Sequence, residues 1–375
     1  MAIPYGRQSV NDDDIAAVLR TLGTEWLTMG PAVSEFESAI AARVDVQGAV
    51  AVSSGTAALH AAYDAMAVGP HDEVITSPMT FVATAATAAL QGATIVFADI
   101  QRDTANIDPT IVETLITGNT RAIAAVDFAG HPADLDELLS MTRPRGITLL
   151  EDAAHSIGSR YRGRPVGAIA DVTTFSFFPT KNLTTAEGGA VVSTNSQLLE
   201  RARRFSRQGL VRDPARQRYP DEGPWHQEVF EFGLNYRLPD VLSALGSSQL
   251  LRLDVFKRRR TEIFERYQVE LADLPGIVLP TRRDYVDPMW HLFPIRVLEG
   301  QRRRVFDELR SNEVFVQVNY IPAYWHPVFE DLGYRRGMCP VAEQFYSEEI
   351  SLPMFAGLSD DDQSFVIDAL RTILA

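Results

Sequence analysis

Apolar residues in the first half of the chain fall into short runs that are continuous rather than alternating. Seven such runs have the length and composition of strands buried on both faces of a sheet. They are AVAVS (49–53), EVITSP (73–78), IVFAD (95–99), AIAAVDF (122–128), ITLLED (147–152), VTTFSF (172–177) and AVVST (190–194). Helix-like stretches such as TAALHAAYDAMAV separate them, which predicts an α/β fold: a mostly parallel sheet wrapped by helices.

The pattern changes after about residue 245. The charged stretch SSQLLRLDVFKRRRTEIFERYQVEL predicts one long helix leading away from the sheet. Strand-like segments follow at HLFPIRVL and FVQVNY, and SDDDQSFVIDALRTIL predicts an acid-capped closing helix. We therefore predict a large α/β domain over residues 1–245, with an N-terminal arm and a first helix capped by Asn11, and a smaller α+β domain over residues 246–375.

Composition narrows the class of protein. The 375 residues are 46% hydrophobic and 22% charged, as in a folded globular chain of about two domains. A formal net charge of −14 argues against a general nucleic-acid binder. The single cysteine, Cys339, cannot form an intrachain disulfide or a cysteine metal cluster. Without a signal-peptide pattern or an apolar run of membrane-spanning length, we expect a cytoplasmic protein with no membrane partner.

Three polar signals follow predicted strands, at the carboxyl ends where open parallel sheets bind ligands. The first is SSGTAAL (53–59), in which Gly55 and Thr56 open a helix. Free backbone amides at this point could bind an anion. An ordinary N-cap by Ser54 or Thr56 would produce the same pattern.

The second signal is EDAAHS (151–156), at the end of the strand ITLLED. Asp152 follows an apolar run, so its carboxylate either pairs with a cation or caps the next helix. His155 is either a core histidine or a group stacked on a ligand ring.

The third signal is FSFFPTKNLTTAEGGAVV (175–192), with Ser176 near a strand end and Lys181 in the following loop. Lys181 is either a structural lysine that reaches outward or a desolvated amine whose lowered pKa makes it a nucleophile. One cofactor, pyridoxal 5′-phosphate, needs all three signals: an anion cradle for its phosphate, a carboxylate for its ring nitrogen and a lysine for its aldehyde. The set is more specific than any member.

The order of SSGTAAL, SPMTFVAT, EDAAHS, FSFFPTKNLTTAEGGA and NYRLPD resembles the DegT/DnrJ/EryC1/StrS family of sugar-nucleotide aminotransferases. The resemblance covers nearly the whole chain and implies a fold-type I pyridoxal-phosphate enzyme with a seven-stranded sheet. The stretches IPYGRQSVNDDDI and NYIPAYWHPVFEDLGYRRG are most similar to the PseC branch. Enzymes of that branch aminate C4 of UDP-linked 4-keto-6-deoxy-N-acetyl-hexosamines.

The resemblance also implies roles for individual residues. Lys181 matches the Schiff-base lysine and Asp152 the partner of the pyridinium nitrogen. The other implied cofactor contacts are Phe81 on the ring, His155 beside it, and Gly55, Thr56 and Ser176 at the phosphate. Asn235 matches an asparagine that reaches the cofactor phosphate of the neighbouring subunit, which implies a homodimer with shared active sites. By residue type alone, Phe81 would be a core aromatic and Asn235 a turn residue.

Departures from the family pattern fall on the substrate side. Phe178 stands where related branches carry histidine, Ala323-Tyr324-Trp325-His326 replaces a YIPVHLQP-like stretch, and Asp127 stands where VHFAG is common. These differences leave the sugar open. The implied sugar contacts are Tyr5, Trp26 and Tyr320. The basic run at 200–218 is either a solvated helix face or a site for the diphosphate.

The predicted reaction moves an amino group from L-glutamate to a nucleotide-linked 4-keto-6-deoxy hexose, with Lys181 as general base and acid. Amination at C3, or a dTDP- or GDP-linked sugar, is the alternative. A 3-dehydratase would carry histidine instead of the lysine. A nicotinamide enzyme would need GxGxxG after the first strand. A non-catalytic regulator on the same scaffold would have no use for the retained lysine, aspartate and phosphate residues.

Overall fold

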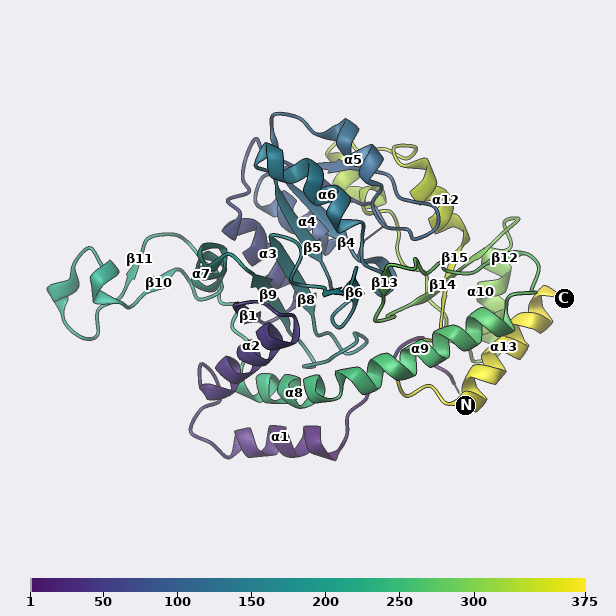
Figure 1. Cartoon of the computed structure of the whole chain (residues 1–375), viewed down its shortest axis with the longest axis horizontal. Coiled ribbons are helices and arrows are strands. Elements are labelled where there is room, and N and C mark those ends of the chain that lie inside the picture. Colours follow the sequence, from purple (N-terminus) through teal and green to yellow (C-terminus); the bar gives the residue numbers. More distant parts are fainter. Residues whose placement is uncertain (1) are drawn as a thin grey trace.

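The structure is a computed structural model that describes residues 2–375. Its centre is a seven-stranded sheet in the order β1-β9-β8-β5-β4-β2-β3 (Figure 1). The strands are β1 (Gly48–Val52), β2 (Glu73–Thr76), β3 (Thr94–Phe97), β4 (Thr120–Val126), β5 (Thr148–Asp152), β8 (Val172–Ser176) and β9 (Gly189–Ser193). Each of the seven predicted strands is confirmed, and both of its ends lie within two residues of the predicted ends. The α/β fold class is confirmed with them.

The sheet is parallel from β3 to β8, and only β9 runs antiparallel to its neighbours β8 and β1. Helices cover both faces, which explains why the strands are continuous apolar runs. One face packs against α3 (Gly55–Ala65), α4 (Ala83–Leu90) and α7 (Ser196–Phe205). The other face packs against α2 (Pro31–Arg43), α5 (Pro109–Leu115) and α6 (Leu135–Thr142).

The predicted long helix is two helices, α8 (Asp240–Leu251) and α9 (Leu253–Glu270), which follow one another across the lower part of the molecule in Figure 1. The break falls at Arg252, whose backbone leaves the helical region at φ −100° and ψ 3°. The Arg252 guanidinium bonds to the buried Asp14 carboxylate of α1 (Asp12–Leu22). Asn11 caps α1 through a reciprocal capping box with Asp14, as predicted.

The C-terminal part contains a three-stranded sheet of β12 (Ile277–Val278), β14 (Phe293–Val297) and β15 (Glu349–Leu352). Helices α10 (Arg302–Ser311) and α13 (Asp360–Leu374) pack on it, so the predicted closing helix is confirmed. The prediction of a strand at FVQVNY is wrong. Phe315 N and Gln317 N each donate to the carbonyl of another segment, at Ile3 and Ser351, but only as isolated contacts. The ladder does not continue, because Val318 N donates to Gln317 Oε1 and Asn319 N to a Glu349 carboxylate oxygen.

Apolar packing crosses the predicted domain boundary in both directions. Ile3 of the N-terminal arm packs in the core of the C-terminal sheet, whereas Phe329 and Phe345 pack in the core of the large sheet. The boundary near residue 245 therefore stays a prediction. Within residues 2–375, no helix combines the length and apolarity needed to cross a bilayer. The remaining elements are β6 (Arg160–Tyr161), β7 (Arg164–Pro165), β13 (Val286–Asp287), α11 (Pro327–Asp331) and α12 (Pro340–Glu348).

One segment projects far from the body of the molecule. It is a two-stranded hairpin of β10 (Leu210–Val211) and β11 (Glu228–Val229), at the left of Figure 1. The hairpin and the residues that directly follow it carry several large exposed apolar side chains: Tyr219, Trp225, Val229, Phe230, Phe232 and Leu234. Such a concentration of apolar surface is typical of an interaction site.

Candidate active site

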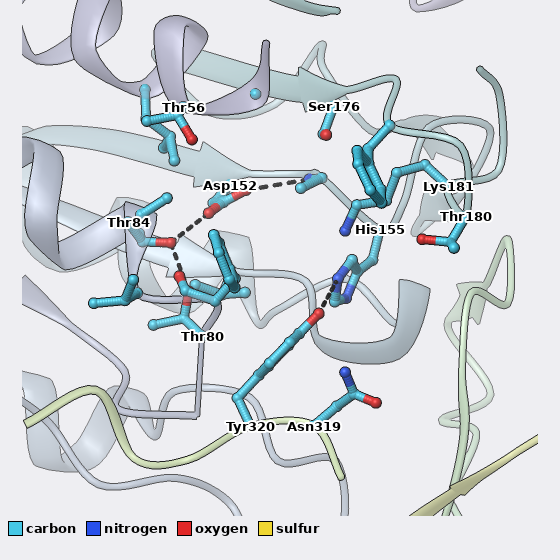
Figure 2. A pocket seen from close by; sticks show the side chains of 18 of the residues that line it. Thr56, Thr80, Thr84, Asp152, His155, Ser176, Thr180, Lys181, Asn319 and Tyr320 are labelled. Atoms are coloured by element: carbon cyan, nitrogen blue, oxygen red, sulfur yellow. Dashed lines mark hydrogen bonds between the residues drawn. The ribbon is translucent and has the colours of Figure 1, made fainter. Parts of the chain in front are cut away.

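A cavity of about 700 Å³ lies where the carboxyl ends of β5 and β8 meet the N-terminus of α3. The irregular segment 317–321 from the C-terminal part closes the opposite side. Figure 2 shows side chains from these elements converging on the cavity, with Lys181, Asp152 and Ser176 across from Tyr320 and Asn319. This is the edge of the sheet at which sequence analysis predicts a ligand.

Lys181 sits in the loop after β8, half-buried, and lines the cavity. Burial lowers the pKa of its amine to about 8, although the Asp152 carboxylate opposes this shift. A minority of the amine, far larger than for an ordinary lysine, is therefore neutral near physiological pH and able to act as a nucleophile or base. The neighbouring Asn182 amide fixes the loop, because it donates to the carbonyls of His155 (2.6 Å) and Met289 (3.0 Å).

Asp152 ends β5 and is 5% exposed. Burial raises the pKa of its carboxyl, whereas hydrogen bonds from Thr84 and Ala154 and the charge of Lys181 lower it. Thr84 Oγ1 donates to Asp152 Oδ2 over 2.6 Å and is in turn bonded to the Thr80 hydroxyl (Figure 2). Sequence reasoning missed both threonines, although they lie in SPMTFVAT, a motif that it used.

The start of α3 is the candidate anion cradle. Ser54 is the N-cap, since its Oγ accepts from Ala57 N over 3.0 Å, so the N-cap interpretation of SSGTAAL is confirmed and anion binding stays a prediction. Gly55 and Thr56 occupy the first turn, where helix N–H groups have no intrahelical partners. A Cβ at Gly55 would lie 2.8 Å from Ser176 Cβ and 2.9 Å from its Oγ, so only glycine fits against Ser176.

Aromatic rings form the remaining wall. His155 Nε2 is 3.0 Å from the Tyr320 hydroxyl, and the His155 ring lies 4.3 Å from the His291 ring. Burial, and then the nearby Lys181, hold the pKa of His155 well below its usual range; burial and the neighbours His155, Lys181 and Arg260 do the same for His291. Both imidazoles are therefore neutral. His291 was missed because it precedes a strand with no motif around it.

Phe81 is 65% exposed although it lines the cavity, and its ring meets Tyr320 edge-on with centroids 6.5 Å apart. It is therefore not a core aromatic. An exposed ring at the mouth of a cavity is available to stack on a planar ligand.

Some of the residues predicted from the family resemblance line the cavity, and others lie outside it. Tyr5, Tyr320, Phe178 and His326 line the cavity. Trp26 and Asn235 are exposed and lie outside the cavity of this chain.

Three of the residues expected on the substrate side, Ala323, Tyr324 and Asp127, do not line the cavity, whereas His326 of the same stretch does. Ala323 and Tyr324 are fully buried in the core, with the Tyr324 hydroxyl bonded to Glu343. Asp127 is fully buried as well, and accepts hydrogen bonds from Ser156 and Ala133. All three lie away from the cavity because their side chains point into packed protein.

The basic run at 200–218 also lies outside the cavity of this chain. Its arginines pair with nearby carboxylates, for example Arg203 with Glu37 at 2.8 Å and Arg216 with Glu200 at 2.9 Å. These pairs favour the interpretation of the run as a solvated, ion-paired surface.

The cavity thus combines a lysine of lowered pKa, a buried carboxylate, an anion cradle and an exposed aromatic ring. These are the groups that bind the amine-reactive, anionic and aromatic parts of pyridoxal 5′-phosphate, and the close approach of Gly55 to Ser176 leaves the cradle open to a phosphate. Fold and site together define an enzyme of the pyridoxal-phosphate class.

The family model of the DegT/DnrJ/EryC1/StrS aminotransferase family matches residues 8–371. The chain belongs to this family. It is 39% identical to the spore coat polysaccharide biosynthesis protein SpsC of Bacillus subtilis, over 99% of this chain and 97% of that one. It is 36% identical to a UDP-4-amino-4,6-dideoxy-N-acetyl-beta-L-altrosamine transaminase of Campylobacter jejuni, over the same shares.

Solved structures agree with the sequence relatives. Helicobacter pylori PseC, described as an aminotransferase of pseudaminic acid biosynthesis, superposes with a TM-score of 0.93 at 31% identity, over 100% of this chain and 99% of that one. A sugar aminotransferase from Streptococcus pneumoniae gives 0.93 at 30% identity, over 99% and 98%, in its PMP form. The same protein is also known in a PLP form.

Proposed function

We propose that this aminotransferase moves the amino group of L-glutamate to C4 of a UDP-linked 4-keto-6-deoxy-N-acetyl-hexosamine. The observation that carries the chemistry is the placement of Lys181 and Asp152 in one cavity beside the Gly55–Ser176 cradle. The sugar is supported by the relatives from Campylobacter jejuni and Helicobacter pylori, whose descriptions name this kind of substrate or pathway.

The residues that would hold the cofactor are Lys181 at its aldehyde, Asp152 at its ring nitrogen, Phe81 and His155 at its ring faces, and Gly55, Thr56 and Ser176 at its phosphate. When bound, pyridoxal phosphate supplies an electron sink for a carbon that has lost a proton.

Each residue then has a defined task. The Lys181 amine, with its pKa lowered to about 8, takes the proton from the α-carbon of the donor and later returns a proton to the sugar carbon that receives nitrogen. Burial raises the pKa of Asp152, and Thr84, Ala154 and Lys181 oppose that shift by stabilising its anion, whose charge would keep a facing ring nitrogen protonated. The neutral imidazoles of His155 and His291 add no competing cation beside the amine.

We further propose a cytoplasmic homodimer in which each active site uses residues of both chains. The support is the projecting hairpin with its exposed aromatics, together with Asn235 and Trp26, which are exposed in the single chain. An apolar arm of this kind is costly in water unless another surface covers it. Sedimentation analysis of the wild-type protein and of Trp225→Ser and Phe232→Ser variants tests this part. A wild-type monomer would contradict it.

A panel of keto-sugar nucleotides with L-glutamate, read by mass spectrometry, tests the substrate. We expect the gain of one amino group on the UDP-linked 4-keto N-acetyl sugar, with 2-oxoglutarate as coproduct. Amination of a dTDP- or GDP-linked sugar, or at C3, would support the alternative substrate. Loss of water without gain of nitrogen would indicate a dehydratase, and a protein that binds no cofactor would indicate a regulator.

A further inference from the structure

Two buried carboxyl groups lie directly behind the active-site aspartate. Asp127 follows β4 and Glu151 belongs to the adjacent strand β5, and both side chains are 0% exposed. Side chains alternate between the faces of a strand, so Glu151 and Asp152 point to opposite faces of the sheet. Ala125, two residues before Asp127, is the register partner of Glu151, which puts Asp127 and Glu151 on the same face.

The hydrogen bonds around this pair leave one atom unexplained. Glu151 Oε2 accepts from Thr173 Oγ1 (2.8 Å) and Gly167 N (3.2 Å). Its Oε1 atom is buried and, among residues 2–375, has no hydrogen-bond partner, although the Asp127 side chain lies on the same face and interacts with this carboxyl. Two ionised carboxylates only accept hydrogen bonds, so the two groups can bond to each other only if one of them carries a proton.

We propose that Asp127 and Glu151 share one proton and that this acid pair positions the turn carrying Asp152 and His155. The positioning role rests on the function proposed above. The shared proton does not, because it is a property of the folded chain alone.

Two hydrogen bonds join Asp127 directly to the turn that carries Asp152 and His155. Asp127 Oδ2 accepts from Ser156 Oγ over 2.6 Å, and its backbone N–H donates to the Asp152 carbonyl over 3.1 Å. Ser156 directly follows His155, so the Asp127 side chain holds one end of the EDAAHS turn while its backbone holds the other. Losing the proton would place two adjacent anions beneath this turn.

The surroundings favour retention of the proton. Burial raises the pKa of both carboxyls, and the charge of Asp152 acts in the same direction on both. The charge of Glu151 raises the pKa of Asp127 further, whereas the interaction with the Asp127 side chain lowers the pKa of Glu151. The neutral groups facing the pair are Ser156, Thr173 and the backbone N–H groups of Ala133 and Gly167, all of which donate.

Infrared spectroscopy of the cofactor-free protein near pH 7 tests the shared proton. A protonated carboxyl has a carbonyl stretching band that carboxylates lack. Asp127→Asn and Glu151→Gln each supply an amide N–H in place of the shared proton, so we expect each variant to lose one such band. Glu349→Gln is the matched control, because Glu349 is another buried carboxyl of raised pKa and should account for a separate band.

A wild-type spectrum in which neither Asp127→Asn nor Glu151→Gln removes a band would overturn the shared proton. If one of these variants fails to fold, the other gives the same reading.

Kinetics of the holoenzyme test the positioning role. Asp127→Asn keeps an acceptor and a donor, so kcat should stay within about threefold of wild type, whereas Asp127→Ala should lower kcat about tenfold or more with a smaller change in KM. Asp127→Asn should also weaken the loss of kcat that wild type shows as the pH rises and the pair ionises. Equal kcat values and pH profiles for Asp127→Ala and wild type would overturn the role.

Discussion

The two sides of the active-site cavity are built differently. On the sheet side, Asp152 and Ser176 end buried strands, and Gly55 opens a helix. On the opposite side, Phe178 and His326 lie in loops or turns, and the 317–321 segment has no ladder hydrogen bonds of its own beyond one bridge. Phe81 and Phe178 are exposed rings at this boundary.

The difference separates chemistry from specificity. Groups at strand ends are fixed by the register of the sheet, and their positions cannot change without loss of the fold. Groups on loops can vary without that cost, with the exception of Lys181, whose loop is anchored by the Asn182 amide. We therefore expect changes on the sheet side to abolish cofactor binding or turnover, and changes on the loop side to alter the sugar that is accepted.

The largest effect should come from Lys181→Ala. Without the amine, turnover should fall by at least about a thousandfold, since proton transfer by a positioned group contributes roughly a hundredfold to ten-thousandfold and covalent attachment is lost as well. Mass-spectrometric detection of the aminated sugar measures this. Binding of pyridoxamine 5′-phosphate, followed by fluorescence, should survive because the cradle is intact. Normal turnover in this variant would remove Lys181 from the mechanism.

Gly55→Ala tests whether the cradle depends on close approach. The new Cβ would lie 2.8 Å from Ser176, so we expect overpacking worth about 1–3 kcal/mol, seen as a tenfold or greater loss of cofactor affinity. Gly118→Ala is the control, since a Cβ there has no heavy atom of the described chain within 4 Å. Titration with pyridoxal phosphate, followed by absorbance, compares the two. Equal affinities would show that the cradle tolerates a side chain.

Phe178→His restores the residue found in related branches and acts on the loop side. KM for the sugar nucleotide should change by up to about tenfold, while the cofactor absorbance stays as in wild type. Phe365→His, at a phenylalanine of similar exposure far from the cavity on α13, should change neither. Bleaching of the cofactor band in Phe178→His would instead place this residue on the chemical side.

The smallest effect is a pH dependence of stability from Glu349. This buried carboxylate accepts from Asn319 N (2.7 Å) and Ser351 Oγ (2.6 Å), and burial raises its pKa to about 8. Because the folded pKa lies above the unfolded one, its stability contribution is present below about pH 4.5 and is lost as the pH rises through about 8. Wild-type Tm should thus fall by a few degrees more than that of Glu349→Gln over this interval. Parallel Tm curves for the two proteins would contradict this.

Sequence reasoning predicted the large sheet well for a physical reason. Strands covered on both faces must be apolar throughout, so their positions are visible in the pattern of residues. It failed at Arg252, where a buried ion pair with Asp14 interrupts a stretch of good helix formers. It failed again at 315–320, where apolar residues alternate as in a strand. There the Asn319 N–H donates to the Glu349 carboxylate instead of to a neighbouring strand.

The candidate site divides in the same way. Lys181, Asp152, Gly55 and Ser176 follow strands in the sequence, so their convergence could be predicted from topology. His291 and Asn319 reach the cavity only through packing of the C-terminal part, which no local pattern records. Asp127 was singled out for the right reason, its departure from a common motif, but its side chain turned out to face Glu151 rather than the sugar.

The Asn182 amide has a consequence for protein engineering. Its single nitrogen binds carbonyls of both the EDAAHS turn and the connection that enters the C-terminal part, at Met289. A fragment cut at residue 245 would keep every cofactor-side group yet lose one of the two anchors of the loop that carries the reactive amine. A minimised catalyst based on this scaffold would therefore have to retain the connection around 289, or supply a substitute carbonyl.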